Sequence, residues 1–247
     1  MVLRSPRKSF FIVEGNIGAG KSTFLNVLNR YLDVDLVYEP CSRWQKVEGD
    51  ENLLENFYND TPRWAYTFQT YAFVTRVLEL EKHARESHNP IHVLERSVFS
   101  DRYCFAKNCY ELDLMSRLEW KLYKDWFNWL VDNYVPIPNG FIYLRVDADV
   151  CFDRLTKRNR HEESSVSLDY LKLLGNKHED WLIEKIEVAP YLANVPVLVL
   201  GCNEDFELDT AEQKRHMHNV VDFLKTHMAE SHFQTILSSW QRSQKEH

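Results

Sequence analysis

Residues 15–23 read Gly15-Asn16-Ile17-Gly18-Ala19-Gly20-Lys21-Ser22-Thr23, directly after the apolar run Phe10-Phe11-Ile12-Val13. This is a complete G-x-x-x-x-G-K-S phosphate loop between a predicted strand and a helical pattern. The glycines let successive backbone N–H groups converge on phosphate oxygens, and the start of the helix adds its positive dipole end. Lys21 adds a mobile charge, and the Ser22 hydroxyl can bind Mg²⁺. A glycine turn without a ligand is the alternative, but the complete motif predicts that this segment binds a nucleoside triphosphate.

Length and charge limit the class of protein. The chain has 247 residues, of which 44% are apolar, so it can bury the core of one α/β domain. Its formal net charge of −7 argues against a nucleic-acid partner, because a nucleic-acid binder would be basic. Its apolar stretches are shorter than the roughly 18–20 residues that span a bilayer, so we expect no membrane partner.

The cysteines and the first residues bear on the compartment. The number of cysteines is odd and their spacing contains no C-x-x-C pair, which predicts reduced thiols and no zinc site. They are Cys41, Cys104, Cys109, Cys151 and Cys202. Residues 1–8 carry three cations but lack the apolar region of a signal peptide. We therefore expect a cytoplasmic protein, and a mitochondrial one remains open.

Five apolar runs of strand length alternate with helical patterns. Such alternation predicts a five-stranded parallel sheet with helices on both faces. The predicted strands are 10–14, 36–39, 91–95, 141–146 and 195–200, and the predicted helices are 21–32, 61–88, 100–110, 115–133, 148–158, 167–187 and 210–228. Linker-like composition is confined to 45–52, 133–140 and the residues after 228. We expect one domain over residues 1–247, with a polar tail from about 229.

Three predicted strands end in carboxylates, at Glu14, Glu39-Pro40 and Glu95-Arg96. Ligands of open parallel sheets bind beyond the carboxyl ends of the strands, so these residues should lie near the phosphate loop. Pro40 keeps Glu39 extended, and Glu39 is our candidate for accepting the proton of an attacking hydroxyl. Glu95 can reach Mg²⁺ with Ser22, while Arg96 can bridge the transferred phosphate and the acceptor. Solvated strand ends are the alternative interpretation.

A cationic cluster follows the fourth predicted strand, at Arg154, Lys157, Arg158 and Arg160. Arg154 and Arg158 are four residues apart and share a helix face. They form either a solvated basic stripe or a lid whose arginines close over the donor phosphates. The acidic net charge and the phosphate loop favour the lid. Glu162 and Glu163 follow directly, and we expect one of them to contact a hydroxyl.

The long helical pattern 61–88 suggests an acceptor pocket. Gln69, Ala72 and Arg76 fall on one helix face. A side-chain amide presents a donor and an acceptor in one plane, which suits the edge of a nucleobase. Aromatic neighbours such as Phe68 supply stacking surfaces. An aromatic helix is often only core, so this prediction depends on the phosphate loop and Glu39.

The ordered set of motifs resembles the deoxyribonucleoside kinases, and the deoxycytidine and deoxyguanosine kinase branch looks nearest. The resemblance runs from about residue 10 to 223 and implies a single-domain P-loop kinase fold, an arginine-rich lid and a homodimer built on paired helices. It also implies Mg²⁺-dependent transfer of the γ-phosphate of ATP, or another nucleoside triphosphate, to a deoxynucleoside 5′-hydroxyl. The matching segments are Glu14-Gly15-Asn16-Ile17-Gly18-Ala19-Gly20-Lys21-Ser22-Thr23, Glu39-Pro40…Arg43-Trp44, Trp64…Thr67-Phe68-Gln69-Thr70-Tyr71 and Glu95-Arg96-Ser97-Val98-Phe99-Ser100-Asp101-Arg102-Tyr103.

The resemblance also implies a role for individual residues. Glu39 takes the position of the general base, with Arg96 beside it, Lys21 on the donor phosphates and Glu95 on the metal side. Gln69 is similar to the base-pairing amide, between the aromatic pair Phe68 and Phe105. By the same resemblance, Tyr58 and Glu163 bind the 3′-hydroxyl of the sugar, and Arg154, Arg158 and Arg160 form the lid. Asp205 and Phe206 lie near the donor base. Trp44 and Ala72 complete the predicted substrate-binding set.

Arg76 and Asp101 bear on which base is accepted. In the resemblance these positions meet at the rim of the base pocket, where an ion pair would leave little room for the 5-methyl group of thymine. We therefore expect deoxycytidine and deoxypurines as substrates; the alternative is an ion pair outside the pocket. The short segment 45–56 is closer to the insect multisubstrate enzyme and the mitochondrial thymidine kinase, so a thymidine-preferring or multisubstrate kinase remains open. A regulatory nucleotide-binding subunit is remote, because Glu39, Arg96 and the lid arginines are intact.

Overall fold

A computed structural model describes residues 8–49 and 51–246, so residues 1–7 of the leader discussed above lie outside it. In this part of the chain five strands form one sheet in the order β2-β3-β1-β4-β5, and every neighbouring pair is parallel. The strands are β1 (Ser9–Gly15), β2 (Asp35–Val37), β3 (Ile91–Glu95), β4 (Gly140–Arg145) and β5 (Val197–Gly201). The predicted five-stranded parallel sheet is confirmed, and with it the α/β fold.

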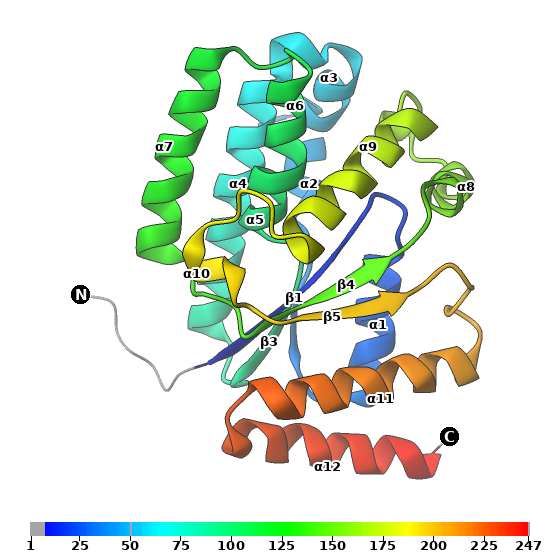
Figure 1. Cartoon of the computed structure of the whole chain (residues 1–247). Helices are drawn as coiled ribbons and strands as arrows, with labels where there is room; N and C mark the ends of the chain where they lie inside the picture. Colours follow the sequence, from blue (N-terminus) through cyan, green and yellow to red (C-terminus); the bar gives the residue numbers. More distant parts are fainter. Residues whose placement is uncertain (1–7, 50, 247) are drawn as a thin grey trace.

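Helices cover both faces of the sheet because alternate residues of each strand point in opposite directions. Phe11 and Val13 of β1 belong to the hydrophobic cluster that includes α1 (Lys21–Tyr31) and α11 (Thr210–His227). Figure 1 shows α11 and α12 stacked below the sheet. Ile12, between these two residues, belongs to the cluster on the other face.

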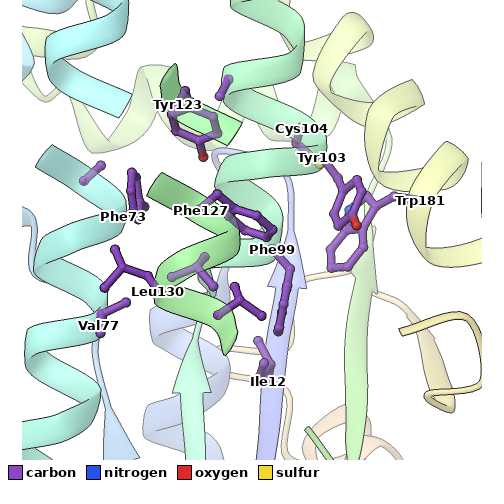
Figure 2. Close-up of a cluster of buried hydrophobic side chains, with 14 of the residues drawn as sticks. Ile12, Phe73, Val77, Phe99, Tyr103, Cys104, Tyr123, Phe127, Leu130 and Trp181 are labelled. Carbon is purple, nitrogen blue, oxygen red and sulfur yellow. The ribbon is translucent and has the colours of Figure 1, made fainter. Parts of the chain in front are cut away.

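The second face is covered mainly by α4 (Thr61–Glu86) and α7 (Arg117–Tyr134). In Figure 2, Phe127 of α7 points toward Phe99, while Phe73 of α4 lies on the other side of α7. Phe73 packs edge to face on Tyr123 with ring centroids 5.3 Å apart. Such pairs add to simple burial, so this one fixes α4, which carries the predicted acceptor residues, against α7.

Two predicted helices are interrupted by π-helical turns. The predicted helix 100–110 consists of α5 (Val98–Ser100), a π-helical turn over Asp101–Ala106 and α6 (Lys107–Glu111). The predicted helix 167–187 consists of α9 (Leu168–His178) and a second π-helical turn, Glu179–Ile183. The single-helix predictions are wrong here, since apolar spacing does not distinguish an α turn from a wider π turn.

Three short helices lie in segments for which neither a helix nor a strand was predicted from the sequence. α2 (Cys41–Gln45) and α3 (Leu53–Asn59) follow β2, and α10 (Pro190–Ala193) precedes β5. The side chain of Asn52 accepts a hydrogen bond from the backbone N–H of Glu55 at 3.0 Å and caps α3. The predicted helix 148–158 is confirmed as α8 (Ala148–Arg158).

The polar tail predicted from about residue 229 is instead a helix, α12 (Glu230–Glu246), packed against α1 and α11. Its apolar stripe of Phe233, Ile236 and Trp240 is buried. The hydroxyl of Ser239 accepts a hydrogen bond from the backbone N–H of Asp33 at 3.0 Å. An amphipathic helix is polar over most of its sequence, so composition hides a stripe of three apolar residues.

Candidate active site

The phosphate loop adopts a conformation that only glycine fits easily. Gly18 and Gly20 have φ angles of +82° and +88°, and a Cβ at Gly18 would lie 2.3 Å from the carbonyl oxygen of Cys151. Gly20 is the N-cap of α1, and no side chain caps that end of the helix. The N–H groups of its first turn are therefore available to bind an anion.

Lys21 is buried beneath the loop. Its Nζ donates to the carbonyl oxygens of Asn16 at 2.7 Å and Gly15 at 3.2 Å. Burial and the nearby charge of Arg96 lower the pKa of Lys21 to about 8, against the opposing effect of the carboxylates around it. A bound phosphate would favour the protonated form, so this lysine is suited to meet an anion.

Ser22 and Glu95 bring two oxygen ligands together at the end of β3. The Ser22 hydroxyl donates to Oε1 of Glu95 at 2.6 Å. Mg²⁺ prefers oxygen ligands and usually binds one or two protein groups, with waters and substrate phosphates completing its shell. In residues 8–49 and 51–246 no set of three or more His, Cys, Asp or Glu side chains could hold a metal by itself. The pair fits a divalent cation such as Mg²⁺ if phosphate oxygens supply the other ligands.

Glu39 lies between two arginines. Arg76 donates to its Oε1 through Nη2, and Nε of Arg96 lies 3.4 Å from the same oxygen. Burial alone would raise the pKa of Glu39, but the charges of Arg76, Arg96 and Lys21 outweigh it and lower the pKa to about 2. The carboxylate is therefore ionised at any working pH, and 15% of its side chain remains exposed.

The predicted acceptor residues line one cavity of about 390 Å³. It is formed by the phosphate loop, the residues after β2 and β3, α4, the first π-helical turn and the segment after α8. Its lining includes Lys21, Ser22, Glu39, Trp44, Tyr58, Phe68, Gln69, Arg76, Glu95, Arg96, Asp101, Phe105, Arg158, Arg160 and Glu163. Ala72 does not line it and is buried in the hydrophobic core, so the geometry gives no support to its predicted place in the pocket.

The residues that line this cavity include Gln69 and two aromatic side chains, Phe68 and Phe105. Oε1 of Gln69 is buried and has no hydrogen-bond partner among the described residues. A buried unpaired acceptor is costly, which points to a ligand that supplies the missing donor. Phe68 stacks on Phe57 with ring centroids 4.5 Å apart, and the guanidinium of Arg96 lies 4.7 Å above the Phe105 ring.

The predicted Arg76–Asp101 ion pair is present, and both residues line the cavity. Burial alone would lower the pKa of Arg76, but the charges of Asp101 and Glu39 raise it above its usual value. Arg76 thus links the candidate base to Asp101. Asp101 and Phe105 both lie on the π-helical turn, and both line this cavity. The turn is wider than an α-helical turn.

The arginines predicted to form a lid divide between two cavities. A second cavity of about 510 Å³ is lined by Arg154, Asp205 and Phe206, and it shares Gly18, Gly20, Thr23 and Arg158 with the first. Arg154 donates to the carbonyl oxygens of Asn203 at 3.1 Å and Glu204 at 3.0 Å. The two cavities therefore meet at the phosphate loop.

Arg158 and Arg160 face the first cavity, where both pair with Glu163. Tyr58 lines the same region, and burial together with the charge of Glu163 raises its pKa above the usual value. The tyrosine hydroxyl therefore remains neutral and can donate a hydrogen bond. Tyr58 and Glu163, proposed for one hydroxyl of the sugar, are both in the cavity that would hold it.

Sequence reasoning did not assign two residues that the structure brings to this region. Tyr170 of α9 lines the first cavity, and no motif in the sequence indicates it. Glu14 is fully buried behind the site and accepts a hydrogen bond from the Ser97 hydroxyl at 2.6 Å. Glu14 stands out in the sequence as a charged strand end beside the phosphate loop, but no role was predicted for it.

The sequence matches known proteins over most of its length. The model of the family "Deoxynucleoside kinase" matches residues 11–225. Deoxycytidine kinase 2 of Gallus gallus is 38% identical over 86% of this chain and 89% of its own, and deoxycytidine kinase of Homo sapiens is 37% identical over 87% and 90%. The mitochondrial deoxyguanosine kinase of Xenopus laevis is 38% identical over 81% and 83%. Within the described residues, none of the helices is both long and apolar enough for a membrane span.

Proposed function

The chain belongs to the deoxynucleoside kinase family, and on that premise we propose that its acceptors are deoxycytidine and the deoxypurine nucleosides. It is a phosphotransferase of nucleotide salvage. We further propose that the donor is ATP or another nucleoside triphosphate, whose γ-phosphate passes to the 5′-hydroxyl. The observation that carries the choice of acceptor is the unpaired amide oxygen of Gln69 beside the Arg76–Asp101 pair.

The protein's part in this reaction is positioning and charge neutralisation, since the transition state of phosphoryl transfer is loose. The donor lies across the phosphate loop, with its base in the second cavity near Phe206 and its γ-phosphate facing the first. Glu39 orients the 5′-hydroxyl and accepts its proton as the oxygen bonds to phosphorus and the bond to the β-phosphate oxygen breaks. Arg96, Lys21 and the lid arginines neutralise the charge of the transferred group.

We propose Mg²⁺ as the metal, held by Ser22 and Glu95. The ion would neutralise phosphate charge and orient the β- and γ-phosphates. Glu95 also accepts a long hydrogen bond from the backbone N–H of Glu39, at 3.5 Å. This contact ties the carboxylate on the metal side to the backbone of the candidate base.

Acceptor recognition is proposed to use both ends of the first cavity. Gln69 pairs with the base edge, Phe68 and Phe105 flank the ring, and Tyr58 with Glu163 binds the 3′-hydroxyl. Initial rates with deoxycytidine, deoxyadenosine, deoxyguanosine and thymidine test the proposal. Equal efficiency on thymidine and deoxycytidine would instead support a multisubstrate or thymidine kinase, and no turnover of any of the four would refute the proposal.

Replacing Arg76 by Met and Asp101 by Ala together should admit thymidine. The pair occupies the rim of the base pocket, so its removal opens space for the 5-methyl group and removes polar contacts to cytosine. We expect the ratio of kcat/KM for thymidine to that for deoxycytidine to rise by at least about tenfold, the effect of about 1.4 kcal/mol. The single variant Asp101→Ala is the control, because it removes one ion-pair partner of Arg76 but leaves the arginine side chain in the pocket. An unchanged ratio in the double variant would contradict the assignment.

A homodimer is proposed through the outer face of α7. Leu118, Leu122, Trp126 and Trp129 recur at helical spacing and are exposed, Trp126 at 51%. A contiguous row of large apolar side chains usually marks an interface. We expect Trp126→Glu to convert a dimer to a monomer in light scattering at micromolar concentration, whereas Lys121→Glu, on the polar face, should remain dimeric. A monomeric parent protein would contradict this proposal.

The cytoplasm is the proposed compartment. The five cysteines are free, as in reducing compartments, and the mitochondrial name of one relative makes mitochondria the alternative. Fractionation of cells that express the tagged full-length chain distinguishes the two, and recovery in the mitochondrial matrix would refute the cytoplasmic assignment.

A further inference from the structure

The backbone of Arg96 is held in an unfavourable conformation. Its φ angle is +61°, in the left-handed region that arginine rarely adopts. The side chain is buried, with Nε 3.4 Å from Oε1 of Glu39 and the guanidinium over the Phe105 ring. Such a conformation persists only where the surrounding structure imposes it, and it is common where geometry serves function.

Two residues of this turn, Arg96 and Ser97, are hydrogen-bonded to strand β1. The N–H of Arg96 donates to the carbonyl oxygen of Val13 at 2.9 Å. The hydroxyl of the next residue, Ser97, donates to Oε1 of Glu14 at 2.6 Å. The same hydroxyl accepts from the backbone N–H of Phe99 at 3.1 Å, so it also caps α5. The carboxylate of Glu14 thus fixes the side chain that follows the strained residue.

Burying the carboxyl group of Glu14 at this position costs folding free energy. Its relative exposure is 0%, and Oε2 has no partner among the described residues. Burial raises its pKa to about 7, although Arg96 and the hydroxyls of Ser97 and Ser100 favour the charged form. An apolar side chain of similar volume would fill this position at lower cost, so stability does not explain a carboxylic acid here.

We propose that Glu14 is a positioning residue for phosphoryl transfer. Its carboxylate holds Ser97, and Ser97 keeps Arg96 in the conformation that directs the guanidinium toward Glu39. Glu14 therefore acts through Arg96 without touching either substrate. This inference rests on the proposed role of Arg96 beside the transferred phosphate.

The first test compares two replacements of Glu14. Glu14→Met fills the space but cannot accept from Ser97, and we expect kcat to fall on the order of 10–100-fold, the usual effect of misplacing a catalytic group. The KM values should change by less than about threefold, and the melting temperature should not fall. Glu14→Gln keeps an acceptor and should restore most of kcat. Ser116→Ala, which removes a similar cap from α7, should lower stability and leave kcat unchanged.

The second test combines Glu14→Met with Arg96→Ala. If Glu14 acts through Arg96, the double variant should be no slower than Arg96→Ala alone. A further loss in that background, or a normal kcat in Glu14→Met, would overturn the inference. A normal kcat in Arg96→Ala would instead refute the proposed role of Arg96 and leave the kinase assignment intact. If Glu14→Met does not fold, Ser97→Ala provides the same comparison with a smaller change.

Discussion

Glu39→Gln should lower kcat by about 10²–10⁴-fold, the range expected when a positioned general base is lost. The amide keeps the shape of the side chain but cannot accept the proton of the 5′-hydroxyl. It also breaks the charge balance with Arg76 and Arg96, so the affinity for the deoxynucleoside should change as well. Steady-state kinetics with saturating donor measure both quantities.

The pH dependence sharpens this test. The pKa of Glu39 is lowered from 4.5 to about 2, so the wild-type carboxylate stays ionised over the whole working range. The ratio of wild-type to variant kcat should therefore be constant between about pH 5 and pH 8. Because the folded-state pKa is depressed, the ion pairs stabilise the fold above pH 4.5 and lose this contribution as the pH falls toward 2. Glu39→Gln should accordingly melt below the wild type at pH 7.

A matched control is Glu179→Gln, which also removes a carboxylate paired with an arginine, Arg145, but lies outside both cavities. It should retain wild-type kcat. A loss below about tenfold in Glu39→Gln would reduce Glu39 to a structural role, since a positioned base contributes more than this.

Lys21→Ala should nearly abolish turnover, with kcat falling on the order of 10²–10³-fold, as for other groups that stabilise transition-state charge. The fold should persist, because burial lowers the pKa of Lys21 to about 8 and thus opposes its charged form. Removing this buried charge should leave the melting temperature at pH 7 unchanged or higher. Lys172→Ala, at an exposed position, is the control and should be fully active. Near wild-type turnover of a well-folded Lys21→Ala protein would refute the assignment of the loop to the donor phosphates.

The same lysine predicts how binding depends on pH. Phosphate raises the pKa of Lys21 from about 8, so donor binding takes up a proton above this pH. The affinity of the wild type for the Mg²⁺ complex of ADP should therefore weaken as the pH rises past about 8. Calorimetry in buffers of different ionisation enthalpy would detect the proton uptake. Lys21→Ala should lack both effects.

Local sequence patterns were sufficient to predict the parallel sheet and the phosphate loop. The apolar runs predicted all five strands, because β1, β3 and β4 are buried along nearly their whole length and the edge strands β2 and β5 are still mostly apolar. The loop motif placed Lys21 and Ser22 because its backbone geometry depends on neighbouring glycines alone. Glu95 could be added because parallel strands end at the same edge of the sheet.

Other features were missed for identifiable reasons. α12 was mistaken for a tail because three buried residues, Phe233, Ile236 and Trp240, are diluted among polar ones. The π-helical turn at Asp101–Ala106 was read as ordinary helix because it changes the winding without changing the apolar spacing. Ala72 shares a helix face with Gln69 in projection, yet it packs in the core and does not reach the cavity.

The sequence by itself determined the parallel sheet, the phosphate loop and the residue types of the site, since these depend on short-range spacing and backbone geometry. Only the tertiary structure showed that Arg76 pairs with Glu39 as well as with Asp101. Arg76 and Arg96 are far from Glu39 along the chain, and their contacts with it follow from the packing of α4 and β3 against the rest of the fold. Burial then sets the pKa values, lowering that of Lys21 and raising that of Glu14, because the cost of an unsolvated charge depends on what surrounds it.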